Sequence, residues 1–201
     1  MALIKLNDRA VKDVTQFGSI SQLGSLTHIS TATASSSASI EFTSGIDSTY
    51  KEYVFYWVNC HPSIDFTRLQ FNLSTDSGST YAVTKTTTSF RAFHDEADTD
   101  SALSYETGND LAQSTGFQDL SDYNGNANDE ASSGYLHLFN PSSTTFVKHF
   151  IANINSVQYS NYSINTFVAG YGNTTSAIDA VKFQMSSGNI DAGQILLFGV
   201  N

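Results

Sequence analysis

The densest run of oxygen-bearing side chains in the sequence lies between residues 122 and 130. Acidic and amide side chains recur there at alternate positions, and Gly125 suits a sharp turn. Ca²⁺ prefers about six to eight oxygen ligands gathered in a compact loop. Because most of these oxygens are neutral amides and no flanking helices are indicated, the loop is not an EF-hand. It predicts weak Ca²⁺ binding at most, and a solvated turn fits the same residues. The candidate metal ligands are Asp122, Asn124, Asn126, Asn128 and Glu130.

A second cluster of titratable residues, His94 to Asp98, is compatible with a metal or acid/base site, but a solvated charge run is the commoner use of such residues. The chain has no G-x-S-x-G, P-loop, H-E-x-x-H or G-x-G-x-x-G pattern. Carboxylates at unknown separations do not define a glycosidase pair. Tyr and Phe side chains can form a sugar-binding platform, although aromatic residues at strand spacing are more often core residues. We therefore expect no enzyme and no bound cofactor.

The charge balance excludes several classes of partner. A formal net charge of −10 with only nine Lys and Arg residues leaves no cationic cluster for phosphate, so we expect neither nucleic-acid nor anionic-membrane binding. The first residues, MALIKLNDRAVKD, are too charged for a signal peptide, and no apolar run of about 20 residues is present. A single cysteine, Cys60, excludes an internal disulfide and suits a buried apolar role.

The composition predicts an all-β fold, an antiparallel β-sandwich. Only 14% of residues are charged, and short runs of β-branched and aromatic residues alternate with Gly, Asn, Asp and Ser. The run from Tyr50 to Cys60 is apolar at nearly every position, which is typical of a central strand buried on both faces. The expected strands are 25–34, 38–43, 50–59, 66–74, 80–84, 87–93, 134–139, 145–155, 161–170, 177–185 and 194–200.

Two segments differ from this strand pattern. Residues 1–22 form a short N-terminal arm before a single sandwich domain over 23–201, and apolar residues in the arm predict that it binds a partner. These arm residues are Leu3, Ile4, Leu6, Val11 and Val14. The stretch 92–147 lacks Lys and Arg and holds ten of the nineteen acids, so we expect a long acidic insertion there, with one short helix near 101–114.

Three segments carry a resemblance to a known group of proteins. They are IEFTSGIDSTYKEYVF (40–55), LQFNLSTDSGSTY (69–81) and SGNIDAGQILLFGV (187–200). The order of an Ile-x-Phe strand, a Thr-Tyr-Lys turn, a Leu-x-Phe strand and a closing apolar strand resembles virion proteins of marine tailed phages, including cyanophages. The resemblance covers most of residues 38–200, and its motifs are structural. It implies a jelly-roll-like sandwich in a phage particle, as a head decoration or fibre module.

The resemblance and the compact chain together favour a capsid decoration (cement) protein, because no heptads or repeats predict a fibre shaft. The alternative is a tail or head fibre module that recognises a host surface glycan, since one fold can host both functions. The expected partners are the major capsid or tail proteins and further copies of the chain, with a trimer favoured. The expected location is the virion, after synthesis in the host cytoplasm.

Overall fold

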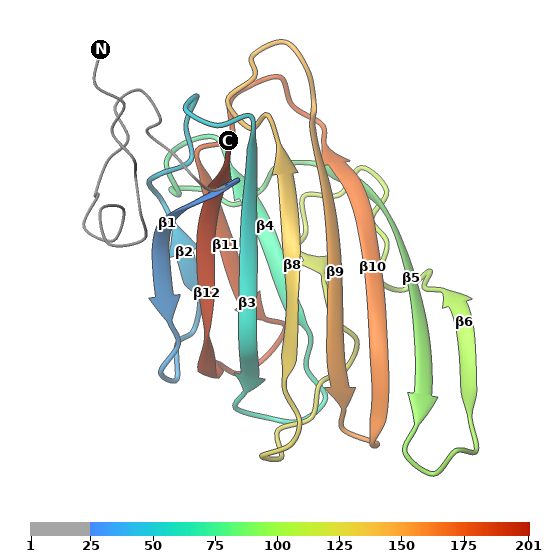
Figure 1. The fold of residues 1–201 in the computed structure, drawn as a ribbon. Coiled ribbons are helices and arrows are strands. Elements are labelled where there is room, and N and C mark those ends of the chain that lie inside the picture. The colour runs from blue at the N-terminus through green and yellow to red at the C-terminus, as the bar shows by residue number, and fades with distance from the viewer. Residues whose placement is uncertain (1–24) are drawn as a thin grey trace, which may run out of the picture.

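In the computed structural model, which describes residues 25–201, these residues form two antiparallel β-sheets packed face to face and contain no helix (Figure 1). The sequence prediction of an all-β sandwich is therefore confirmed. No helix long and apolar enough to cross a membrane occurs within residues 25–201.

The larger sheet has eight strands, in the order β1 (Leu26–Thr33), β12 (Ile190–Val200), β3 (Glu52–Pro62), β8 (Ser132–Phe139), β9 (Lys148–Gln158), β10 (Tyr162–Gly172), β5 (Lys85–Asp95) and β6 (Ser101–Tyr105). The smaller sheet has four, in the order β2 (Ile40–Phe42), β11 (Ala180–Met185), β4 (Leu69–Ser74) and β7 (Gln118–Asp119).

Eight of these strands have the order of a jelly roll. β1 pairs with β12, β2 with β11, β3 with β8 and β4 with β7, as in one long antiparallel ribbon. Rolling up this ribbon brings β12 beside β3 and β11 beside β4, and these pairs join the ribbon into two sheets. The topology therefore agrees with the jelly-roll-like sandwich that the sequence resemblance implies.

The remaining four strands are two hairpins inserted into the roll, β5–β6 between β4 and β7, and β9–β10 between β8 and β11. Both extend the larger sheet beyond β8. This corrects the expected insertion at 92–147, because that stretch cuts through β5 and contains β7 and β8, which belong to the roll itself. The acidic stretch is thus part of both sheets rather than a separate excursion.

Local predictions failed at three places. The helix expected near 101–114 is absent, because residues 101–105 form β6 and pair with β5. The predicted strand 80–84 is extended chain without a ladder, held by the Asn72 side chain, which donates to the Tyr81 carbonyl at 2.7 Å. The two-residue strand β7 was not predicted. The predicted N-terminal arm, residues 1–22, lies outside the described residues. Each of the other predicted strands overlaps a strand of the structure.

The hydrophobic core lies between the two sheets and includes inward residues of β9 and β10. Successive inward residues of β3 (Tyr53, Phe55 and Trp57) are fully or almost fully buried. The Phe55 ring packs 5.3 Å from Phe42 and 5.4 Å from Phe183, both in the smaller sheet. Because these rings join strands from both sheets, the aromatic cluster fixes how the sheets sit on each other.

Replacing Phe55 by Ala should therefore lower the free energy of unfolding by about 3–5 kcal/mol through lost burial and the cavity left behind. Urea denaturation measures this loss. Phe146→Ala is the matched control, because Phe146 is 69% exposed and should change stability little. Equal effects of the two substitutions would show that β3 does not form the core.

Beneath β5 the interior is polar. Lys85, at the start of β5, is fully buried, and its Nζ donates to Asn72 Oδ1 and to the Val83 carbonyl. Burial disfavours the charged ammonium and lowers the pKa of Lys85 to about 7. The folded protein thus releases a proton that the unfolded chain, whose Lys pKa is about 10.4, retains.

This difference in pKa predicts a pH dependence of stability. Between pH 7 and pH 9 the unfolded state binds the extra proton, so the free energy of unfolding should rise with pH. The contribution is lost as the pH falls through the folded pKa. Lys85→Met should flatten the rise in chemical denaturation curves, whereas Lys51→Met at an exposed position should preserve it. Superimposable pH profiles of the wild type and Lys85→Met would refute the assignment.

Candidate docking face

The larger sheet has an outer face that the smaller sheet does not cover. Side chains alternate between the two faces, as β9 illustrates: Phe150, Ala152 and Ile154 are buried inward, while Ile151 and Asn153 point outward. The same alternation runs through β8, β10 and β5. The outward residues, apart from the fully buried Val54, therefore form a surface from β12 to β6.

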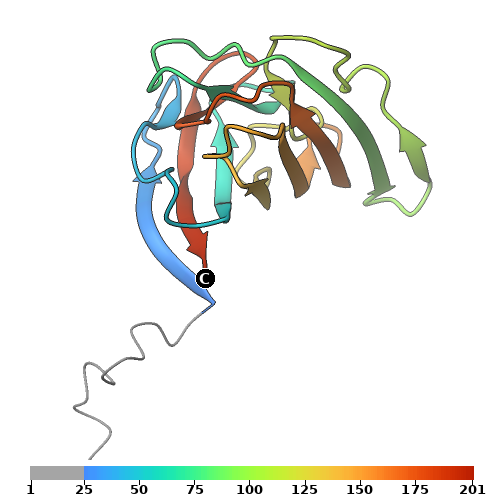
Figure 2. The ribbon, with the colours of Figure 1, turned by 90° about the horizontal axis from the view of Figure 1, so that it is seen from above.

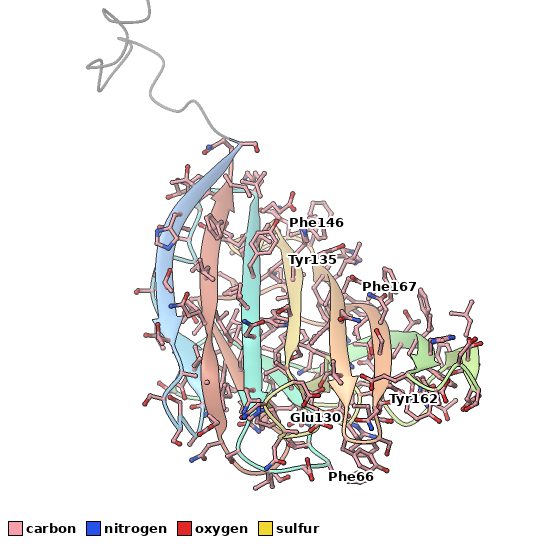
Figure 3. The ribbon with its side chains drawn as sticks, turned by 60° about the horizontal axis from the view of Figure 1, so that its bottom comes forward. Phe66, Glu130, Tyr135, Phe146, Tyr162 and Phe167 are labelled. Carbon is pink, nitrogen blue, oxygen red and sulfur yellow. The ribbon has the colours of Figure 1, made fainter. Side chains whose placement is uncertain are left out.

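The strand register aligns aromatic residues across this outer face. One row, the aromatic row, crosses seven strands through direct pairs of the ladder. The Phe90 and Phe167 rings stack at 5.0 Å with an angle of 9° between their planes, and they are 42% and 39% exposed. Figure 3 labels Phe167 and Tyr135 on this sheet. The row consists of Leu196, Tyr56, Tyr135, Asn153, Phe167, Phe90 and Tyr105.

A shallow groove runs beside the aromatic row. Small side chains, Ala169 and Thr88, occupy the next row, between the Phe90–Phe167 pair and Tyr171. The groove has a volume of about 490 Å³ and is lined mostly by apolar and aromatic groups, including Phe139. This part of the face therefore offers a concave apolar surface next to flat rings.

Charge is absent from the centre of the outer face. The row on one side of the aromatic row contains Phe198, Val54, His137, Ile151, Ala169 and Thr88, and the row on the other side contains Gln194, Val58, Ser133, Asn155, Asn165, Ala92 and Leu103. None of the residues in the three rows is Asp, Glu, Lys or Arg. Glu52 lies just beyond them and contacts His137 Nδ1. We call the three rows the docking face, because the cores of protein interfaces are likewise rich in aromatic and poor in charged residues.

Two of the residues predicted to bind a metal, Asp122 and Glu130, have other partners through their carboxylates. Asp122 is buried and forms an ion pair with Arg91 of β5. Glu130 is also buried, and its Oε2 accepts from the Ala127 backbone N at 2.6 Å. Asn124 is buried and its backbone pairs with Thr67, but its side-chain amide has no hydrogen-bond partner among the described residues, while Asn126 and Asn128 are exposed. Within residues 25–201, no three His, Cys, Asp or Glu side chains lie together in a way that could hold a metal.

The backbone at Gly125 lies against the buried Glu130 carboxylate. A Cβ atom at this position would lie 2.0 Å from Glu130 Oε2, so a larger residue would require the Glu130 side chain to move. The Glu130 carboxylate also accepts from the Ala127 backbone N, so contacts within the loop contribute to its shape.

The other candidates from the sequence have structural roles. His94 Nε2 lies 3.1 Å from Asp98 Oδ1, and both side chains are largely exposed, as expected of a surface charge run. Cys60 is buried, and burial raises the pKa of its thiol to about 12, which keeps the thiol protonated.

Sequence reasoning missed the docking face because its rows exist only in the paired sheet. Tyr56, Tyr135 and Phe167 come from distant strands, and each is a common strand residue by itself. Comparisons with protein families, with curated proteins and with solved structures find no match for this chain.

The ion pair between Asp122 and Arg91 predicts a stability effect. Asp122→Ala leaves Arg91 with Glu106, whose Oε1 lies 2.9 Å from Arg91 Nε, and should lower the free energy of unfolding by about 1–3 kcal/mol. Asp129→Ala in the same loop, at an exposed position, should have little effect.

Adding a chelator separates the ion pair from the metal hypothesis. If Arg91 alone neutralises Asp122, the thermal midpoint of the wild type should be the same with and without EDTA. A midpoint that falls with EDTA and recovers with Ca²⁺ would restore the metal site.

Proposed function

We propose that this protein is a structural component of a phage virion, a capsid decoration protein that attaches to the assembled head through the docking face. The observation that carries the proposal is the uncharged aromatic surface in a chain of net charge −10. The jelly-roll order of the strands and the resemblance of residues 38–200 to virion proteins of tailed phages support a role in a phage particle.

A protein surface is the occupant that best matches the docking face. The face is broad, crosses seven strands and carries rings that pack edge to face, as Tyr56 does with Phe198 at 5.7 Å and with Tyr135 at 6.2 Å. Burying such rings stabilises a complex by about 25 cal/mol for each Å² of apolar surface removed from water. The three rows contain no carboxylate, so docking buries no unpaired negative charge from them.

A charge placed on the docking face should prevent attachment. Phe167→Asp puts a carboxylate in the middle of the aromatic row, where docking would bury it unpaired, so incorporation into particles should fall by about tenfold or more. Phage grown in cells that supply the tagged variant would be purified and the protein quantified per particle.

Two controls accompany this substitution. Ile64→Asp introduces the same charge at a residue that is 42% exposed in the β3–β4 connection, away from the docking face, and should incorporate normally. A melting curve confirms that each variant is folded. Normal incorporation of folded Phe167→Asp would refute docking through this face.

Copy number distinguishes decoration from the fibre alternative. A decoration protein should occur in numbers comparable to the capsid subunit, whereas a few copies per particle, confined to the tail, would identify a fibre module. Quantitative mass spectrometry of intact virions provides the ratio.

A further inference from the structure

A separate cavity lies at the lower end of the sandwich in Figure 1, where β5 and β9 end and β10 begins. Its volume is about 350 Å³, near the lower limit of about 300 Å³ for small-molecule sites. The side chains that define its chemistry are Arg91, Phe93, Asp100, Gln158, Tyr159 and Tyr162. Arg91 and Phe93 alternate with the outward residues of β5, so the cavity opens on the opposite side of the sheet from the docking face.

Aromatic rings form the apolar part of the cavity. The Phe93 and Tyr162 rings meet at 5.7 Å in an edge-to-face arrangement, and the Arg91 guanidinium lies 5.2 Å from the Phe93 ring. The Tyr162 hydroxyl donates to Asp100 Oδ2 at 3.3 Å. Figure 3 shows Tyr162 near this end of the sheet. A planar ligand in the cavity would therefore contact the aromatic rings and the Asp100 carboxylate at the same time.

Asp122 binds two polar side chains that line the cavity, those of Arg91 and Gln158. It forms an ion pair with Arg91 and accepts from Gln158 Nε2 at 3.4 Å. Glu106 contacts Arg91 as well, at 2.9 Å. Because these bonds exist without a ligand, the side chains need little reordering when one binds.

A second group of rings adjoins the cavity through Tyr159. The Tyr159 ring meets Phe66 edge to face at 5.0 Å, and Phe66 stacks on Tyr123 at 3.8 Å. The Arg68 guanidinium covers the other face of Tyr123 at 3.7 Å. Phe66 is 50% exposed, and its left-handed backbone (φ 62°) holds the ring at the lower end of the molecule, as Figure 3 shows. Together the rings extend the apolar surface beyond a single cavity.

The charged side chains around the cavity indicate which class of ligand it can bind. Two carboxylates, Asp122 and Glu106, offset the one cation, Arg91, and Asp100 adds a further negative charge. An anionic ligand would therefore be repelled. Rings for stacking, together with Asp and Gln side chains for hydroxyl groups, match a neutral ligand that has one apolar face and many hydroxyls.

We propose that this cavity binds a neutral saccharide, with a pyranose ring stacked on Tyr162 and its hydroxyls donating to Asp100 and Gln158. The site is independent of the docking face, because the two open on different sides of the sheet. A protein attached through the docking face can thus bind a glycan at its lower end.

The test uses the isolated full-length protein and a panel of methyl glycosides of glucose, galactose, mannose and N-acetylglucosamine, with glucuronate as the anionic comparison. Backbone amide shifts in NMR spectra report where each sugar binds. At least one neutral glycoside should shift amides of residues 158–162 and of Asp100, and glucuronate should not. Binding of glucuronate alone, or no shift with any neutral glycoside, would overturn the proposal.

Paired substitutions locate the site. Tyr162→Ala and Asp100→Asn should each weaken binding by about tenfold, because each removes a ring or a charged acceptor. The matched control is Tyr105→Ala, since Tyr105 also donates to a carboxylate, Asp110 at 2.7 Å, and pairs with Phe90 on the outer face, on the opposite side of the sheet from the cavity. Unchanged affinity in folded Tyr162→Ala would refute the site.

This result is separable from attachment to the virion. Tyr162→Ala should incorporate into particles like the wild type, whereas Phe167→Asp should bind the sugar normally and fail to incorporate.

Discussion

The difference in width between the two sheets governs the rest of this structure. The larger sheet has eight strands and the smaller has four, so the smaller sheet cannot cover the inner face of its partner completely. Beneath the jelly-roll strands the contact is apolar and aromatic. Toward β5 the contact becomes polar: Thr87 donates to Gln118 Oε1 at 2.6 Å, and Lys85 is buried against Asn72. At the lower end of β5 and β10 the cover stops, and the cavity around Tyr162 opens there.

The inserted hairpins create the width that both proposed sites require. A jelly roll alone would end its larger sheet at β8. Adding β9–β10 and β5–β6 doubles that sheet and supplies four of the seven residues of the aromatic row. The same two hairpins supply every named side chain of the cavity, with Asp100 and Tyr159 coming from their turns. Function therefore concentrates where the fold departs from the basic roll, as is common for sites built on widespread folds.

The acidic residues are distributed so that they avoid the docking face. Asp119 contacts Arg68 at 3.2 Å, and burial raises the pKa of Asp119 despite this partner. Asp122 and Glu106 share Arg91. Other acids lie at the β5–β6 turn, where Asp95 at the end of β5 accepts from the Thr99 hydroxyl and from the Asp100 and Thr99 backbone N atoms, which lowers the pKa of its carboxyl group. These acids thus lie away from the centre of the outer face, which carries no Asp, Glu, Lys or Arg in its three rows.

The sequence by itself determined the fold class, most of the strands and the absence of the common catalytic motifs. Alternation of apolar and polar residues, as in Phe150–Ile154, is a local property that any strand with one buried face must show. Position along the ribbon and the register between distant strands are not local, so only the tertiary structure decided them. It placed Asp122 beside Arg91, and Tyr162 beside Asp100, 62 residues away. It also aligned Tyr135 with Phe167 on one face, because cross-strand neighbours depend on which strands pair, and hydrophobic periodicity carries no information about pairing.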